Sequence, residues 1–228
     1  MSAVGPGDGC DRALHKQAAL PKHRSPMSEP PAPPRTRKPR GQGPLRRAEI
    51  LAAAKTLFLQ HGVEHATMRR IAAAVGVSST ALYVYFPDKT AILTGIAEGL
   101  FEELLVVHAK ATDPAKLPLQ RLRDGLQAYV DLAFARADEY RLTFGSNACN
   151  EIAAADQSFE KLVINVSELI DAGLFAPANP MVVSEAIWSC VHGVVMILLN
   201  QSDHIATDPA LLVHTVLTAA IQGFRPPA

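Results

Sequence analysis

The chain has 228 residues, of which 48% are hydrophobic and 19% charged, and its formal net charge is zero. This length supports one or two domains whose core needs no disulfides. The three cysteines form no Cys-x-x-Cys pair, which argues against a disulfide scaffold or a structural zinc site. No uninterrupted apolar run reaches the roughly 18 residues of a membrane span, so we expect no membrane insertion.

The zero net charge conceals an asymmetry along the chain. Residues 1–43 carry eight Lys and Arg against three Asp and Glu, residues 44–90 carry six against three, and residues 91–228 carry eight against sixteen. A basic N-terminal part and an acidic C-terminal part suggest that the N-terminal end of the chain faces a polyanion. An idle, solvated charge run is the alternative for the first segment.

Residues 1–44 form a Pro-rich, low-complexity segment. Four prolines fall between residues 30 and 34, and no apolar periodicity accompanies them. Such a segment cannot bury enough apolar surface to offset the entropy lost on ordering. We therefore predict a disordered basic arm.

A first amphipathic helix is predicted between Leu45 and Gly62, because apolar residues recur there at helical spacing and glycine suits the end of a helix. The stretch His61–His65 also spells H-x-x-E-H, an inverted zinc-protease motif. Since the helix should end at Gly62, the two histidines should not share a helical face. We expect no metal and no catalytic residue here.

Two short helices joined by a glycine turn follow. Thr67 is a suitable N-cap for residues 68–74, and Ser78 is a suitable N-cap for residues 79–85. Gly76 lies in the turn between them. This arrangement has the form of a helix-turn-helix, whose second helix enters the major groove of DNA.

The second of these short helices divides into two faces. Leu82 and Phe86 are predicted to face a small core. The other side carries small, polar and aromatic groups that can reach base edges or phosphates. These outward residues are Ser79, Thr80, Tyr83 and Tyr85.

The rest of the chain is predicted to be helical, so the fold class is all-α. Asp88 is the N-cap of a long fourth helix, and apolar faces predict four further helices. No β-alternation of any length is present. The predicted helices cover about residues 89–110, 119–134, 159–173, 180–200 and 208–223.

The last two predicted helices are the most apolar long segments outside residues 45–92, and the first of them is apolar on nearly all sides. A helix that is apolar all round must be buried all round, and the rest of so small a bundle covers only part of two such helices. The remainder most simply meets a two-fold copy in an isologous four-helix interface. We expect Val195 and Leu217 to lie in that interface.

The residues from 45 to 93 combine into one longer pattern. Its positions are Arg47, Ile50, Leu51, Ala54, Leu57, Phe58, Gly62, Thr67, Ile71, Ala72, Val75-Gly76-Val77-Ser78, Ala81-Leu82-Tyr83, Tyr85-Phe86, Lys89 and Leu93. This pattern resembles the DNA-binding domain of TetR-type (TetR/AcrR) transcriptional regulators. The resemblance implies a homodimer with a DNA-binding domain at 45–92, joined by the fourth helix to a ligand-binding and dimerisation domain at 93–225.

The resemblance also assigns roles to single positions. The positions that commonly face bases in this family match Arg69, Ser79, Thr80 and Val84. Those that commonly face phosphates match Thr67, Tyr83, Tyr85 and Lys89. The valine can make only apolar contact, for example with a thymine methyl group. Arg46 and Arg47, which continue the basic arm, are expected to add affinity for phosphates irrespective of sequence.

The segment Trp188–Gly193 is similar to the Trp-x-x-x-His-Gly segment of a subset of TetR-type C-terminal domains. Trp188 and His192 are four residues apart and so share one helical face. Together with Tyr129 and Phe144 they are candidates for the wall of a ligand pocket. A core histidine hydrogen-bonded to a neighbour, with the aromatic residues packed in the core, is the alternative interpretation.

These observations predict a bacterial, cytoplasmic, nucleoid-associated regulator. In the leading interpretation it is a repressor that binds a palindromic operator in double-stranded DNA as a homodimer, and a small-molecule effector releases it by shifting the fourth helix. No cofactor and no enzymatic activity are expected. The alternatives are an activator or architectural factor without a small ligand and, less favoured, a helical enzyme or a lipid-binding bundle.

Overall fold

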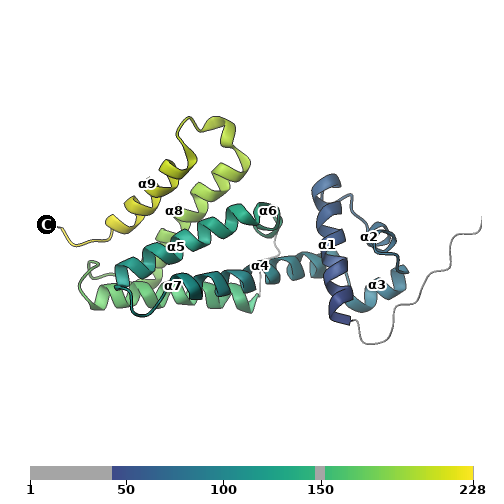
Figure 1. Cartoon of the computed structure of the whole chain (residues 1–228), viewed down its shortest axis with the longest axis horizontal. Helices are drawn as coiled ribbons and strands as arrows, with labels where there is room; N and C mark the ends of the chain where they lie inside the picture. Colours follow the sequence, from purple (N-terminus) through teal and green to yellow (C-terminus); the bar gives the residue numbers. More distant parts are fainter. Residues whose placement is uncertain (1–42, 147–151, 228) are drawn as a thin grey trace, which may run out of the picture. The chain divides into compact units, whose positions relative to one another are not determined.

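The computed structural model describes residues 43–146 and 152–227, and within these ranges every regular element is a helix. The predicted all-α fold class is therefore confirmed, whereas nearly all of the predicted basic arm lies outside the described residues (Figure 1). The α-helices are α1 (Gly43–His61), α2 (Met68–Ala74), α3 (Ser79–Tyr85), α4 (Lys89–Ala111), α5 (Pro118–Ala135), α6 (Ala137–Phe144), α7 (Ala153–Asp171), α8 (Pro180–Asn200) and α9 (Pro209–Gln222), with a short 3₁₀ turn at Ser202–His204.

Local capping fixes the boundaries of the first helices. The side chains of Thr67, Ser78 and Asp88 accept a hydrogen bond from the backbone N–H three residues further on, at 3.2, 3.1 and 2.7 Å. Gly62 and Gly76 have φ values of +78° and +68°, a region that glycine enters without steric cost. The predicted helix-turn-helix is thus confirmed, with α2 and α3 at the expected residues.

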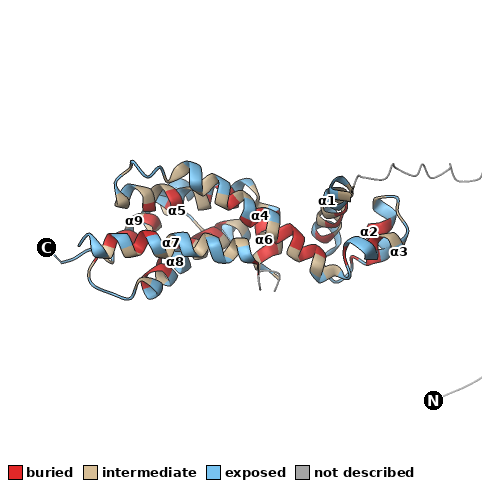
Figure 2. Ribbon diagram, turned by 90° about the horizontal axis from the view of Figure 1, so that it is seen from below, coloured by how far each residue is buried: buried red, intermediate tan, exposed pale blue. Residues whose placement is uncertain are grey.

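The N-terminal helices enclose one end of the hydrophobic core, which continues along α4 into the C-terminal helices. Leu82 and Phe86, predicted to point inward, are 0% and 1% exposed. Figure 2 shows buried positions on α1, on α2 and along α4 beside them. The other large apolar residues buried in α1 and α2 are Ile50, Phe58, Met68 and Ile71.

The C-terminal half of α4 packs against α5, α6 and α7, while α8 packs against α5, α7 and α9 (Figure 1). Helix α8 is long and apolar enough to cross a membrane by length and composition alone. Its inward residues, among them Ile187, Val191 and Val195, are covered by the neighbouring helices.

Two features differ from the sequence-based expectation. Helix α6 is separate from α5, because Arg136 leaves helical geometry at φ −120° and ψ 41°, and no glycine or proline marks that break. Val195 and Leu217 are 0% and 3% exposed within the chain itself. The expectation that these two residues face a second copy is wrong, because the chain's own helices already cover them.

Gly95 lies at the close contact between α4 and the N-terminal helices. A Cβ atom there would lie 3.1 Å from Leu51 Cδ2, 3.2 Å from Arg47 Nη2 and 3.4 Å from Phe86 Cε1. Gly99, one turn further along α4, has no such neighbour within 4 Å. The two glycines therefore differ in the space available to a side chain, although both lie in the same helix.

This difference predicts opposite effects of one substitution at two neighbouring sites. Gly95→Leu should lower the free energy of unfolding by about 1–3 kcal/mol, because the side chain forces α1 away from α4. Gly99→Leu should raise it by up to about 1 kcal/mol, because leucine is the better helix former. Urea denaturation measures both; equal stability of the two variants would contradict the close packing at Gly95.

Candidate functional site

The exposed side of α3 carries the residues predicted to meet DNA bases and phosphates. Tyr83, Val84 and Tyr85 are 52%, 81% and 37% exposed, so three consecutive large side chains reach the surface of one short helix. Thr80 is exposed as well, and Ser79 is half-buried at the start of the helix. The helix thus presents five of the predicted side chains beside one another while Leu82 anchors it from behind.

The residues predicted to surround α3 are partly engaged within the fold. Arg69 is exposed in the first turn of α2, and Thr67 caps that helix. The Lys89 ammonium donates to the backbone oxygens of Val63 and Glu64, at 2.8 and 3.3 Å. Lys89 therefore holds the loop between α1 and α2 against the start of α4.

Arg46 and Arg47, expected in the basic arm, lie inside α1 and form ion pairs there. Arg46 Nη1 is 2.9 Å from Glu49 Oε2, one turn away. Arg47 Nη2 is 3.2 Å from Glu98 Oε2 of α4, and its guanidinium lies 4.9 Å from the centre of the Phe86 ring. The sequence pattern did not reveal the α4 partner because it is 51 positions away.

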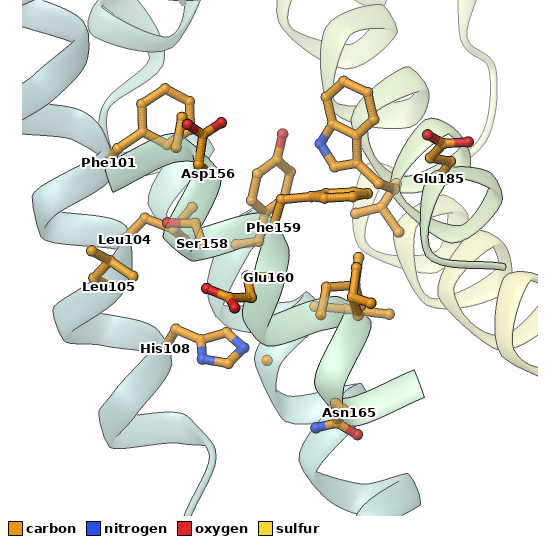
Figure 3. Close-up of a pocket in the computed structure, with 18 of the residues that line it drawn as sticks. Phe101, Leu104, Leu105, His108, Asp156, Ser158, Phe159, Glu160, Asn165 and Glu185 are labelled. Carbon is orange, nitrogen blue, oxygen red and sulfur yellow. The ribbon is translucent and has the colours of Figure 1, made fainter. Parts of the chain in front are cut away.

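A cavity of about 730 Å³ lies among the helices of the C-terminal part. Its lining comes from α4, α5, α7 and α8, with one residue of α6, and Figure 3 shows many of these side chains. Tyr129, Phe144 and Trp188, three of the four predicted pocket residues, belong to the lining. The volume falls within the range of pockets that bury drug-sized molecules.

His192, the fourth predicted pocket residue, lies behind this wall. Its Nδ1 is 2.5 Å from the Tyr140 hydroxyl and 3.0 Å from the Tyr129 hydroxyl, and the two hydroxyls are 2.6 Å apart. The imidazole also stacks on Trp188, with ring centroids 5.0 Å apart. Burial lowers the pKa of His192, which favours the neutral ring and leaves Nδ1 able to accept a tyrosine hydrogen bond.

Several polar residues of the lining were not predicted as pocket groups. Asp156, Glu160 and Glu185 are exposed carboxylates, and the imidazole of His108 is half-buried. Burial, and then the nearby charge of Lys161, lowers the pKa of His108. No spacing motif joins these residues, because they come together only when α4, α7 and α8 pack.

An ion-pair network joins α1 to the C-terminal helices. Lys55 Nζ of α1 lies 2.7 Å from Glu139 Oε1 of α6, and Arg136 Nε lies 3.4 Å from the same oxygen. Burial alone would raise the pKa of Glu139, but the hydrogen bond from Lys55 and both cationic charges bring that pKa below its usual value. Tyr140, which reaches His192, is the next residue of α6.

The zinc-protease pattern at His61–His65 is broken as expected, since α1 ends at His61. Throughout residues 43–146 and 152–227, no group of His, Cys, Asp and Glu side chains could hold a metal ion. The described residues thus form two candidate sites: the exposed polar and aromatic face of α3, and a mostly apolar cavity among the C-terminal helices.

Two separate regions of the chain match models of tetR-type regulatory proteins. Residues 50–96 match the model of the bacterial regulatory proteins of the tetR family, and residues 122–220 match that of the tetracyclin repressor-like C-terminal domain. The HTH-type transcriptional regulator YfiR of Bacillus subtilis (strain 168), itself uncharacterized, is 30% identical over 146 residues, covering 60% of this chain and 71% of the relative.

Two further likenesses extend over most of the chain. The HTH-type transcriptional repressor BepR of Brucella suis biovar 1 (strain 1330) is 27% identical over 197 residues, covering 80% of this chain and 93% of the relative. The solved structure of a protein with unknown function from Rhodococcus sp. RHA1 has the same fold, with a TM-score of 0.66, 24% identity, and coverage of 79% of this chain and 95% of that one. The chain therefore belongs to the tetR family of bacterial regulatory proteins and is a DNA-binding, non-enzymatic transcriptional regulator of the helix-turn-helix type.

Proposed function

We propose that the protein is a ligand-responsive repressor of the bacterial cytoplasm, acting at the nucleoid as a homodimer on a palindromic operator. The observation that carries this proposal is the cavity of about 730 Å³ lined in part by α4, the helix that also packs against α1 and Phe86 of the DNA-binding end. A factor without a small ligand has no need of such a cavity. The relatives BepR and KstR2 are named repressors and the relative FasR is named an activator, so repression is the more frequent role among these three.

In this proposal the exposed face of α3 enters the major groove. Arg69, Ser79, Thr80 and Val84 meet bases, and the tyrosines on either side of Val84 meet phosphates. Arginine can bind guanine with two hydrogen bonds and so specifies sequence, whereas a tyrosine hydroxyl on phosphate positions the helix without specifying. The two kinds of contact should respond differently to substitution.

Arg69→Ala should weaken binding to the operator by about 1–3 kcal/mol and leave binding to scrambled DNA nearly unchanged. Tyr83→Phe should weaken binding to both DNAs by a similar factor. Fluorescence anisotropy on an operator selected by the wild-type protein from a random pool measures both affinities. Arg225→Ala, near the C-terminus, is the control, and a loss of discrimination in Tyr83→Phe would contradict the assignment.

For dimerisation we propose the outward side of α8 and α9. Ile197 and Leu211 are 43% and 57% exposed, and an added Cβ on Gly193 would meet no atom within 4 Å. A two-fold copy packed on this side would form the isologous interface that two half-sites, roughly 34–36 Å apart, require.

Ile197→Glu and Leu211→Glu together should produce a folded monomer, because both side chains are exposed in the single chain but would be buried in the dimer. Val106→Glu on α4, where the valine is 53% exposed, is the matched control and should leave the dimer intact. Sedimentation velocity gives the oligomeric state and circular dichroism the fold. A wild-type chain that is monomeric at micromolar concentration would refute the dimer proposal.

We propose that the signal from the cavity passes through α6 as well as α4. Phe144 of α6 lines the cavity, and its ring centroid lies 4.6 Å from that of Tyr140. A ligand that displaces Phe144 would move Tyr140 and the adjacent Glu139, which holds Lys55 of α1. The effector can shift DNA affinity only by as much as it prefers the released conformation.

Lys55→Gln and Glu139→Gln should each weaken operator binding, and the double variant should be no weaker than either one. Residues in contact show coupling free energies of about 0.5–3 kcal/mol in such cycles. Because the pKa of Glu139 is lowered in the folded protein, its carboxylate is ionised at and above the ordinary pKa of a glutamate. It becomes protonated only when the pH falls through the lower pKa of the folded state. The coupling should therefore be equal at pH 6 and pH 8, and additive effects of the two substitutions would contradict the proposed link.

A further inference from the structure

Carboxylates outnumber basic groups in the lining of the cavity, whose one basic side chain among the described residues is the imidazole of His108. Asp156 and Glu160 lie one turn apart on α7, and Glu185 lies on α8; no Lys or Arg belongs to the lining among the described residues. All three carboxylates are exposed, so they lie where the cavity meets solvent. A ligand at this rim therefore meets negative charge.

A second acceptor lies in the buried part of the lining. Asn165 of α7 is 8% exposed, and its Oδ1 has no hydrogen-bond partner among the described residues. Figure 3 shows its amide at one end of the pocket, away from Asp156 and Glu160. A buried amide oxygen without a donor costs free energy, so this site favours a ligand that brings an N–H or O–H group.

Aromatic rings form another part of the lining. Phe159 and Trp188 meet edge to face with centroids 6.3 Å apart, and Phe101 and Phe144 do so at 6.0 Å. Such rings bury an apolar body and attract cations to their faces. The remaining lining is mostly aliphatic, with leucines of α4 and α5 and valines of α7 and α8.

We propose that the effector is an amphiphilic organic cation: a protonated amine whose charged head lies at the Asp156 and Glu160 carboxylates, whose apolar body fills the cavity, and which carries a hydrogen-bond donor toward Asn165. This inference rests on the proposed function of the cavity as an effector site. An anionic ligand such as a fatty acid finds no Lys or Arg in the described lining and is repelled by the carboxylates of the rim.

Three ligands that share one apolar tail and differ in the charge of the head group test directly whether the cavity prefers a cation. Dodecylammonium, dodecanol and dodecanoate share a twelve-carbon chain and differ only in the head group. Trp188 is the only tryptophan of the chain and lies in the lining, so its fluorescence reports binding without a label. Dodecylammonium, below its micelle concentration, should bind about tenfold more tightly than dodecanoate, since each rim carboxylate contributes up to about fivefold.

The double variant Asp156→Asn with Glu160→Gln should lose this preference, with weaker amine binding and stronger dodecanoate binding. Asp171→Asn, at the end of α7 and outside the lining, is the matched control and should keep the wild-type preference. Circular dichroism confirms that the variants fold. A wild-type protein that binds dodecanoate as tightly as dodecylammonium, or a double variant with an unchanged preference, would overturn the proposal.

Adding the same ligands to the operator complex separates this inference from the proposed function. Release of DNA by dodecylammonium supports both. Amine binding without any change in DNA affinity would refute the effector function of the cavity but would still support its preference for a cationic ligand. Release of DNA by dodecanoate and not by dodecylammonium would support an effector function and overturn the cationic ligand.

Discussion

Helix α4 carries the hydrophobic core from the N-terminal helices into the C-terminal bundle. The N-terminal part of α4 packs through Gly95 against α1 and Phe86, and its C-terminal part supplies Phe101 and Leu104 to the bundle and to the wall of the cavity. Side chains in a close-packed interior cannot shift independently. A displacement of α4 at one end should therefore strain its packing contacts at the other end. The Lys55–Glu139 ion pair adds a second, electrostatic link between the same two regions.

The N-terminal helices were predictable because their signals are local. Thr67, Ser78 and Asp88 cap the helices that follow them, and Gly62 and Gly76 occupy backbone conformations that favour glycine. Each signal acts within three or four residues, which is the range that a sequence pattern can show. The division between α5 and α6 was not predictable, because no such residue marks it.

The candidate site was only partly predictable, for a different physical reason. Exposure of Tyr83 and Val84 follows from which face of a short helix holds Leu82. A cavity, by contrast, is a place where packing stops, and hydrophobic periodicity describes only where packing occurs. The same limit explains Val195, since an apolar residue shows that it must be covered and does not show whether its own chain or a copy covers it.

The internal ion pairs of the N-terminal helices also change how ionic strength should act on the regulator. Binding to DNA becomes salt-sensitive in proportion to the phosphates neutralised by cations that the protein has available. Arg46 and Arg47 already face carboxylates, and Lys89 is held by two backbone oxygens. If α3 contacts DNA as proposed, each of these cations must give up a partner within the fold before it can neutralise a phosphate. The salt sensitivity of operator binding should therefore be smaller than a count of every basic residue near α3 implies.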